Sequence, residues 1–143
     1  MPRLLLRVLA RLSPPGEAQE AAVLAANLRA AKRFRDARIP LVIGSDAGNS
    51  SLLSEFHGTS TLRELELLAD AGIPAADVLA AATRVPAEML GISADAGTVE
   101  PGKRGDLVVL ASDPLANIRA IRTIRWTIQG GVVHTPEEWM QQP

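Results

Sequence analysis

The longest regular pattern of apolar and polar positions lies between residues 17 and 37. Apolar side chains recur there at spacings of four, three and three residues, which places them on one stripe of a helix: Leu24, Leu28, Ala31 and Phe34. Acidic residues lie in the first turns and basic residues near the end, an order that complements the helix dipole. The pattern predicts one helix over Glu17–Ala37, with the basic cluster as a solvated helix end.

An unbroken apolar run, Leu41–Ile43, follows this helix after a short turn at Arg38. A run without polar alternation is typical of a parallel strand that is covered on both faces, and Pro40 stands at its start, where a missing N–H does least harm. Gly44 and the small residues after it permit a sharp turn. The residues predict a helix and then a buried strand, the second half of a β/α unit.

The predicted strand ends in a loop that carries one carboxylate, Asp46. Barrels and open sheets of the α/β class place their chemistry at the C-terminal ends of strands, so Asp46 is a candidate catalytic residue. An aspartate here can equally cap the next turn. The strand alone leaves both interpretations open.

Three helices in succession then end the β/α alternation. Thr61 and Glu64 match a capping box, which predicts a helix from Thr61 to Ala71 with a stop at Gly72. Proline at the first-turn position predicts two more helices, Ala75–Thr83 after Pro74, and a short one that begins at Pro86 and ends at Leu90-Gly91.

From Gly97 onward the pattern is that of a small antiparallel β segment. We expect strands over 97–103 and 105–110, a turn at Asp113-Pro114-Leu115, and a strand over 121–128 whose even positions form its more apolar face. Gly130-Gly131 predicts a hairpin turn into a last strand over 132–134.

The amino-acid composition excludes several classes of partner and metal site. A net charge of −1 gives no footprint for nucleic acid or an anionic membrane, and 3% aromatic residues do not make a stacking platform. The absence of cysteine excludes disulfides and thiolate metal sites, and two histidines cannot supply a three-histidine metal site. No apolar run approaches the roughly 20 residues of a membrane span. We expect no nucleic-acid or membrane partner.

The first sixteen residues are the least defined part of the sequence. Residues 2–12 are leucine-rich and basic, and could form a strand, a helix or a leader; we favour a strand or a partly ordered segment. Arg7 and Arg11 interrupt the apolar region and two prolines follow it, so it makes a poor secretory signal, and we expect a cytoplasmic protein.

Three motifs occur here in one order: Gly-Ser-Asp-Ala-Gly at 44–48, His57-Gly58, and the run Glu100-Pro101-Gly102-Lys103-Arg104-Gly105-Asp106 followed by Leu107–Leu110. Asp113-Pro114-Leu115 and the ending Ile128-Gln129-Gly130-Gly131 extend the last motif. In this combination the chain resembles the C-terminal part of the amidohydrolase superfamily, and it is most similar to imidazolonepropionase-like and dipeptidase-like members. The resemblance covers roughly residues 20–134.

The resemblance implies an α/β fold, the last β/α unit or units of a TIM-like (β/α)8 barrel followed by the C-terminal part of a small β-sandwich. Leu41–Ser45 then corresponds to the last barrel strand and Thr61–Ala71 to the last barrel helix. We expect three parts: residues 1–16 as a leader or poorly defined segment, 17–96 as the barrel portion and 97–143 as the sandwich portion.

The resemblance also implies the chemistry. Asp46 matches the strand-end aspartate that binds a divalent metal, usually zinc, and shuttles the proton. The metal makes a bound water acidic and polarises the scissile carbonyl, while the carboxylate moves a proton from the water to the leaving nitrogen. His57 corresponds to a substrate contact or a loop anchor, and we carry it as a substrate-binding candidate. His134 is expected to be a surface or sandwich residue.

The sequence departs from the family in two respects. The family site also needs a His-Xaa-His pair and further histidines from other strands, which this sequence lacks, and such a barrel needs on the order of 250 residues. We therefore expect an incomplete barrel, a C-terminal fragment that is inactive alone and that self-associates or pairs with a missing N-terminal half.

Two functions remain at this point. The first is a metal-dependent hydrolase that acts on carbon–nitrogen bonds of small-molecule amides or dipeptides. The second is a non-catalytic remnant that serves as a binding or assembly module. An upstream reading frame that encodes the missing histidines would favour the first.

Overall fold

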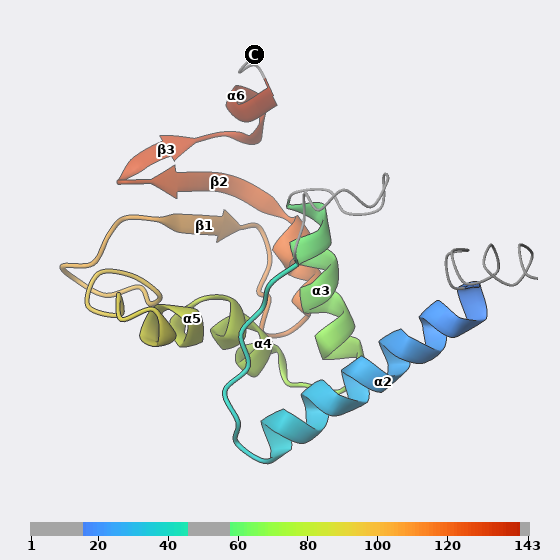
Figure 1. The fold of residues 1–143 in the computed structure, drawn as a ribbon. Helices are drawn as coiled ribbons and strands as arrows, with labels where there is room; N and C mark the ends of the chain where they lie inside the picture. The colour runs from blue at the N-terminus through green and yellow to red at the C-terminus, as the bar shows by residue number, and fades with distance from the viewer. Residues whose placement is uncertain (1–15, 46–57, 141–143) are drawn as a thin grey trace, which may run out of the picture.

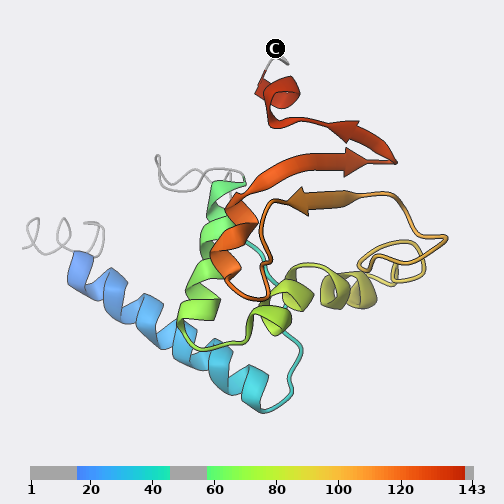
Figure 2. The same cartoon turned by 180° about the vertical axis from the view of Figure 1, so that it is seen from behind.

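The computed structural model describes residues 16–45 and 58–140. A helical part lies on one side and a small antiparallel sheet on the other, and the long first helix extends away from both (Figure 1; Figure 2 shows the reverse side). The elements are α2 (Glu17–Asp36), α3 (Thr59–Asp70), α4 (Ala75–Ala82), α5 (Arg84–Met89), β1 (Leu107–Leu110), a 3-10 helix η1 (Ile118–Arg122), β2 (Ile124–Gln129), β3 (Val132–His134) and α6 (Pro136–Met140). None of the described helices is long and apolar enough to cross a membrane.

Helix α2 confirms the predicted long helix, but the buried stripe is partly wrong. Leu28 and Ala31 are half-buried, as expected, whereas Leu24 and Phe34 are 43% and 48% exposed. The helix packs against α3 and is joined to α4 by the Arg35–Asp77 ion pair, and its N-terminal half projects away (Figure 1). A helix that packs near one end buries only the part of its apolar surface that faces the contact.

The predicted buried strand at Leu41–Ser45 is wrong for this structure. The segment is irregular, with Leu41 and Ile43 half-buried against the core and Val42 40% exposed. The Ile43 N–H donates to the carbonyl oxygen of Ala81 in α4 at 3.1 Å, and no described strand lies beside the segment. A β-strand is stabilised by backbone hydrogen bonds to adjacent strands. Without such strands, this apolar segment still packs side chains against the core but forms no strand.

The hydrophobic core joins the helices to the 3-10 helix. Its buried members come from α3, the loop after it, α4 and η1: Leu65, Ile73, Val78, Ile118 and Ile121. The sequence pattern placed Ile121 in a strand, which is wrong. Ile118 and Ile121 are three residues apart, the spacing that puts side chains on one face of a 3-10 helix, so both reach the core. The division at residue 96 stays a prediction.

Two helix starts also differ from the prediction. Helix α3 begins at Thr59 after Gly58, so Thr61 lies inside the helix and the capping box is wrong. Helix α5 begins at Arg84, which makes Pro86 its third residue rather than its first. Pro86 is tolerated at the third position because the N–H groups of the first helical turn need no helical partner.

The sheet confirms the hairpin and the strand before it. The order is β1-β2-β3, with Val109 opposite Trp126 and Ile128 opposite Val133. Gly130 and Gly131 have φ of 57° and 85°, as a two-residue type I′ turn requires. The Asp113 turn is also confirmed, since Asp113 Oδ1 accepts the Leu115 N–H at 2.8 Å.

The strand predicted over residues 97–103 is wrong. These residues form a loop, and Gly97 has φ of +96° and lies so close to α5 that a Cβ added there would meet the Ala87 Cβ at 2.6 Å. The close approach to a helix replaces strand pairing in this segment. The even positions of β2 are apolar, as predicted, but Trp126 is 47% exposed.

Candidate active site

The two residues singled out by the sequence, Asp46 and His57, both lie outside the described residues. The structure describes the residues immediately before Asp46, which are Ile43, Gly44 and Ser45, and the helix α3 that follows the loop. The candidate site is therefore built from what holds the segment that leads to Asp46.

Helix α3 approaches Gly44 and Ser45 with two side chains. The Thr61 hydroxyl donates to Ser45 Oγ at 3.2 Å. Glu64 lies near the Gly44 backbone N–H, which opposes the rise in the pKa of its carboxyl group. Thr61 and Glu64 are three residues apart, so they lie on one face of the helix one turn from each other. One face of α3 therefore lies against the segment that leads to Asp46, with Ser45 bound by Thr61.

Glu64 is an unusual residue for this position. Its Oε2 atom is buried and has no hydrogen-bond partner within residues 16–45 and 58–140. Burial raises the pKa of Glu64, and the hydrogen bond from the Gly44 N–H offsets part of that effect. A buried carboxylate oxygen without a donor costs free energy, and such atoms gather where function requires a polar group.

Sequence reasoning missed this role of Glu64. The Thr-Xaa-Xaa-Glu spacing was interpreted as a capping box, and only the start of α3 at Thr59 shows that both side chains are free to turn toward Gly44 and Ser45. The signal in the sequence was the pair itself, with its spacing of one helical turn.

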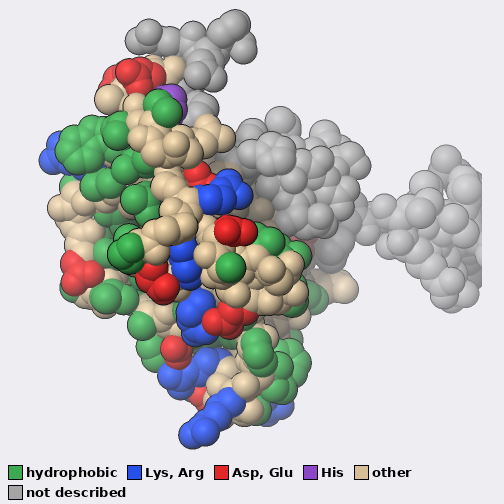
Figure 3. Space-filling view, turned by 90° about the vertical axis from the view of Figure 1, so that its left-hand side faces the viewer, with side chains coloured by type: hydrophobic (Ala, Val, Ile, Leu, Met, Phe, Trp, Pro, Cys, Tyr) green, Lys and Arg blue, Asp and Glu red, His purple; other side chains and the backbone are tan. Residues whose placement is uncertain are grey.

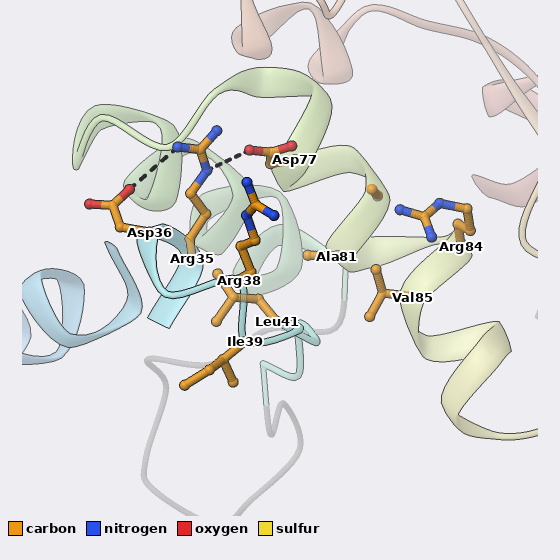
Figure 4. A pocket seen from close by; sticks show the side chains of 10 residues that line it. Arg35, Asp36, Arg38, Ile39, Leu41, Asp77, Ala81, Arg84 and Val85 are labelled. Carbon is orange, nitrogen blue, oxygen red and sulfur yellow. Dashed lines mark hydrogen bonds and ion pairs between the residues drawn. The ribbon is translucent and has the colours of Figure 1, made fainter. Parts of the chain in front are cut away.

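A polar groove lies at the other end of the same segment (Figure 4). It has a volume of about 570 Å³ and is lined by Arg35, Asp36, Arg38, Ile39, Leu41, Asp77, Ala80, Ala81, Arg84 and Val85. Arg35 donates to Asp77 at 2.7 Å and to Asp36 at 3.3 Å. The groove meets the segment at Ile39 and Leu41.

Charge on the surface is mixed. The face drawn in Figure 3 carries basic side chains toward its lower end with acidic side chains among them. This distribution matches the near-neutral net charge and gives no extended basic patch on that face.

The described part of the chain does not supply a metal site. Within residues 16–45 and 58–140, no group of three or more histidine, aspartate or glutamate side chains is arranged to hold an ion. Asp46 is the one metal ligand that the sequence predicted, and it lies outside the described residues.

Comparison of the sequence with models of protein families identifies the family of this chain. The model of the amidohydrolase family matches residues 13–133, most of the chain. The chain belongs to the amidohydrolase family. A comparison with curated protein sequences finds no match.

Solved structures resemble this amidohydrolase chain in fold. A Xaa-Pro dipeptidase with bound methionine superposes with a TM-score of 0.62 and 27% identity, over 73% of this chain and 25% of the dipeptidase. Molinate hydrolase has a TM-score of 0.64 and 27% identity, over 78% of this chain and 27% of its own. Phenylurea hydrolase B has a TM-score of 0.53 and 28% identity, over 57% and 18%. The chain thus spans about a quarter of the first two proteins.

Proposed function

We propose that this chain is part of a metal-dependent hydrolase that cleaves carbon–nitrogen bonds in small-molecule amides or dipeptides. The observation that carries the proposal is the amidohydrolase family match over residues 13–133, which includes Gly44, Ser45 and Asp46. The names of the similar structures, a Xaa-Pro dipeptidase and phenylurea hydrolase B, support hydrolysis as the reaction class. We also propose that, in the complete hydrolase, Leu41–Ser45, which is irregular in this structure, takes the place of the last barrel strand, and that Thr61–Ala71 takes the place of the last barrel helix.

Asp46 is proposed as the proton-transferring carboxylate. It would accept a proton from the attacking water and donate it to the leaving nitrogen, a role that suits a carboxylate within hydrogen-bond reach of both. A divalent ion, zinc by the resemblance, would supply the acidity of the water and polarise the carbonyl. The described residues do not form a donor set for that ion, and a lone carboxylate does not hold zinc tightly.

His57 is proposed as a substrate contact in the loop after Asp46. A contact to substrate that leaves the metal untouched affects binding more than proton transfer. Replacing His57 with Asn in an active preparation should therefore raise KM with the metal content unchanged.

A second candidate is a non-catalytic assembly module. Large apolar side chains are exposed on both parts of the structure, among them Val42, Met89, Leu90, Val99, Val108, Trp126, Val132 and Val133. Exposed apolar surface of this extent marks contact with another chain or segment. Both candidates therefore predict association, and they differ in activity.

The test expresses the chain alone and together with the polypeptide encoded directly upstream of it, which we call the completed hydrolase. A Xaa-Pro dipeptide, an N-acyl amino acid and a phenylurea serve as substrates, with a chelator as control. Chelator-sensitive hydrolysis by the completed hydrolase supports the proposal, and its absence on all three favours the module.

The chain alone should neither hydrolyse these compounds nor retain zinc through gel filtration. One equivalent of zinc per isolated chain, lost on Asp46→Ala, would overturn the view that its donor set is incomplete.

A further inference from the structure

The groove drawn in Figure 4 combines three guanidinium groups with apolar side chains. Arg35 comes from the last turn of α2, Arg38 from the turn after that helix, and Arg84 from the first residue of α5. The apolar part of the lining consists of Ile39, Leu41, Ala80, Ala81 and Val85. The volume of about 570 Å³ falls within the roughly 300–1,000 Å³ that is common for small-molecule sites.

Both acidic side chains of the groove already have cationic partners. Asp77 pairs with Arg35 at 2.7 Å, and Asp36 pairs with Lys32 at 2.9 Å and with Arg35 at 3.3 Å. Three arginines against two aspartates leave the lining with one positive charge in excess. The groove therefore favours an anion over a cation as its ligand.

Arg38 is the arginine of this groove that has no side-chain partner among residues 16–45 and 58–140. Arg35 is held by two aspartates, and Arg84 pairs with Glu88 at 2.7 Å. Figure 4 shows the Arg38 side chain directed toward the side of the groove where Arg35 and Asp77 lie. Its guanidinium can therefore offer its N–H donors to a ligand.

The backbone of Arg38 is also unusual. It has φ of 59° directly after α2, a place where helices commonly use glycine, and its N–H donates to the carbonyl oxygen of Arg35 at 2.9 Å. The left-handed conformation costs a residue with a Cβ roughly 1–2 kcal/mol. Strained residues of this kind gather at ligand sites, where the side chain is used.

We propose that this groove binds a small organic anion that carries one carboxylate on an apolar body. The Arg38 guanidinium, a planar fork that matches a carboxylate, would bind the charged group. The apolar body would pack on Ile39, Leu41 and Val85. A single excess positive charge suits a singly charged carboxylate better than a doubly charged phosphate. The proposal does not depend on the role of Asp46.

The experiment titrates the full chain with isocaproate, a carboxylate on a branched aliphatic body, at low ionic strength. Ligand-observed NMR gives the affinity, and the Nε–H resonance of Arg38 reports contact with the groove. We expect a Kd on the order of 1 mM for isocaproate. The uncharged isocaproamide should bind at least about 10-fold more weakly, because hydrogen bonds between charged groups are the stronger ones. Equal binding of the amide, or tighter binding of inorganic phosphate, would contradict the proposal.

Arg38→Asn removes the guanidinium, and asparagine tolerates the left-handed conformation. This variant should weaken isocaproate binding by about 10-fold or more. Arg33→Asn is the matched control, because Arg33 is an exposed arginine in the last turn of α2 outside the groove, and its affinity should equal that of the wild type.

A structural role for Arg38 gives a different result. A basic residue at the end of a helix can serve only to complement the helix dipole. In that case Arg38→Asn lowers the free energy of unfolding in urea while the affinity for isocaproate stays at the wild-type value, and the proposal is wrong. An Arg38 Nε–H resonance that does not shift on saturation with isocaproate would also overturn it.

Discussion

Arg122 in η1 forms a bidentate ion pair with Glu66 in α3, 56 residues earlier in the chain. Arg122 Nε lies 2.6 Å from Glu66 Oε1 and Nη2 lies 3.1 Å from Oε2. Glu66 is 5% exposed, and the hydrogen bond from Arg122 lowers the pKa of its carboxyl group. The pair joins η1, which lies between β1 and β2, to α3, the helix whose Thr61 also binds Ser45.

Breaking this pair should destabilise the fold. Arg122→Met removes both donors and leaves the buried Glu66 with Arg63 at 3.6 Å as its remaining ion-pair partner among the described residues. Because Glu66 is buried and would keep its desolvation penalty without these donors, we expect the free energy of unfolding in urea titrations at pH 7 to fall by more than it does when an exposed ion pair is broken.

The neighbouring pair Arg119–Asp70 is the matched control. It joins the same two helices with distances of 3.1 and 3.0 Å, but both side chains are exposed. Arg119→Met should therefore cost less than about 1 kcal/mol. Equal losses for the two variants would show that burial of Glu66 does not set the strength of the pair.

Arg38 should be a site of stabilisation. It follows α2 with φ of 59°, a conformation that costs a residue with a Cβ roughly 1–2 kcal/mol. Arg38→Gly keeps the backbone bonds at this helix end and removes that cost, offset in part by the greater freedom of glycine in the unfolded chain. We expect unfolding free energy to rise by about 0.5–1 kcal/mol.

Arg33→Gly is the control for Arg38→Gly. Arg33 is an exposed residue in the last turn of α2, where glycine should cost about 1 kcal/mol. A loss of stability in both variants would mean that the Arg38 side chain contributes more than its backbone conformation costs.

Glu64 should give stability a distinctive pH dependence. Burial raises its pKa in the folded state above the value of 4.5 for a free glutamate, so the folded state holds the proton to higher pH than the unfolded state. The free energy of unfolding should therefore fall as pH rises above about 4.5 and level off above the folded pKa. In Glu64→Gln that fall should disappear.

Glu66 contributes with the opposite sign in a lower range. Its folded pKa is lowered, so its stabilisation is complete above pH 4.5 and is lost as pH falls through the folded value. Urea titrations from pH 3 to 8 on the wild type and on Glu64→Gln separate the contributions of Glu64 and Glu66 to stability. Identical pH profiles above 4.5 would show that Glu64 is not kept from ionising by burial.

Sequence patterns predicted correctly the elements whose conformation depends mainly on residues that are close together in the chain. Helix α2 follows from its apolar spacing and charge order, and the β2–β3 turn follows from Gly130-Gly131, which adopt the required positive φ. These features depend on nearby residues, so they could be read without knowledge of the rest of the fold.

Elements that depend on distant partners were mispredicted. Leu41–Ile43 has the composition of a buried strand but has no described strand beside it, and Ile121 matched a two-residue period although it turns into the core from a 3-10 helix. Glu64 had the spacing of a cap and instead lies partly buried inside α3, with an unpartnered Oε2 atom among the described residues. The roles of Asp46 and His57 stay predictions, since both lie outside the described residues.

The most direct measurement is the effect of Asp46→Asn on kcat and zinc content in the completed hydrolase, with the exposed Asp70→Asn as control. Asn keeps the shape of the side chain and removes the proton-accepting charge. We expect kcat to fall by about 10²- to 10⁴-fold, with zinc content falling less and the control near wild type. Near-normal kcat in Asp46→Asn would show that Asp46 caps a turn and does not transfer the proton.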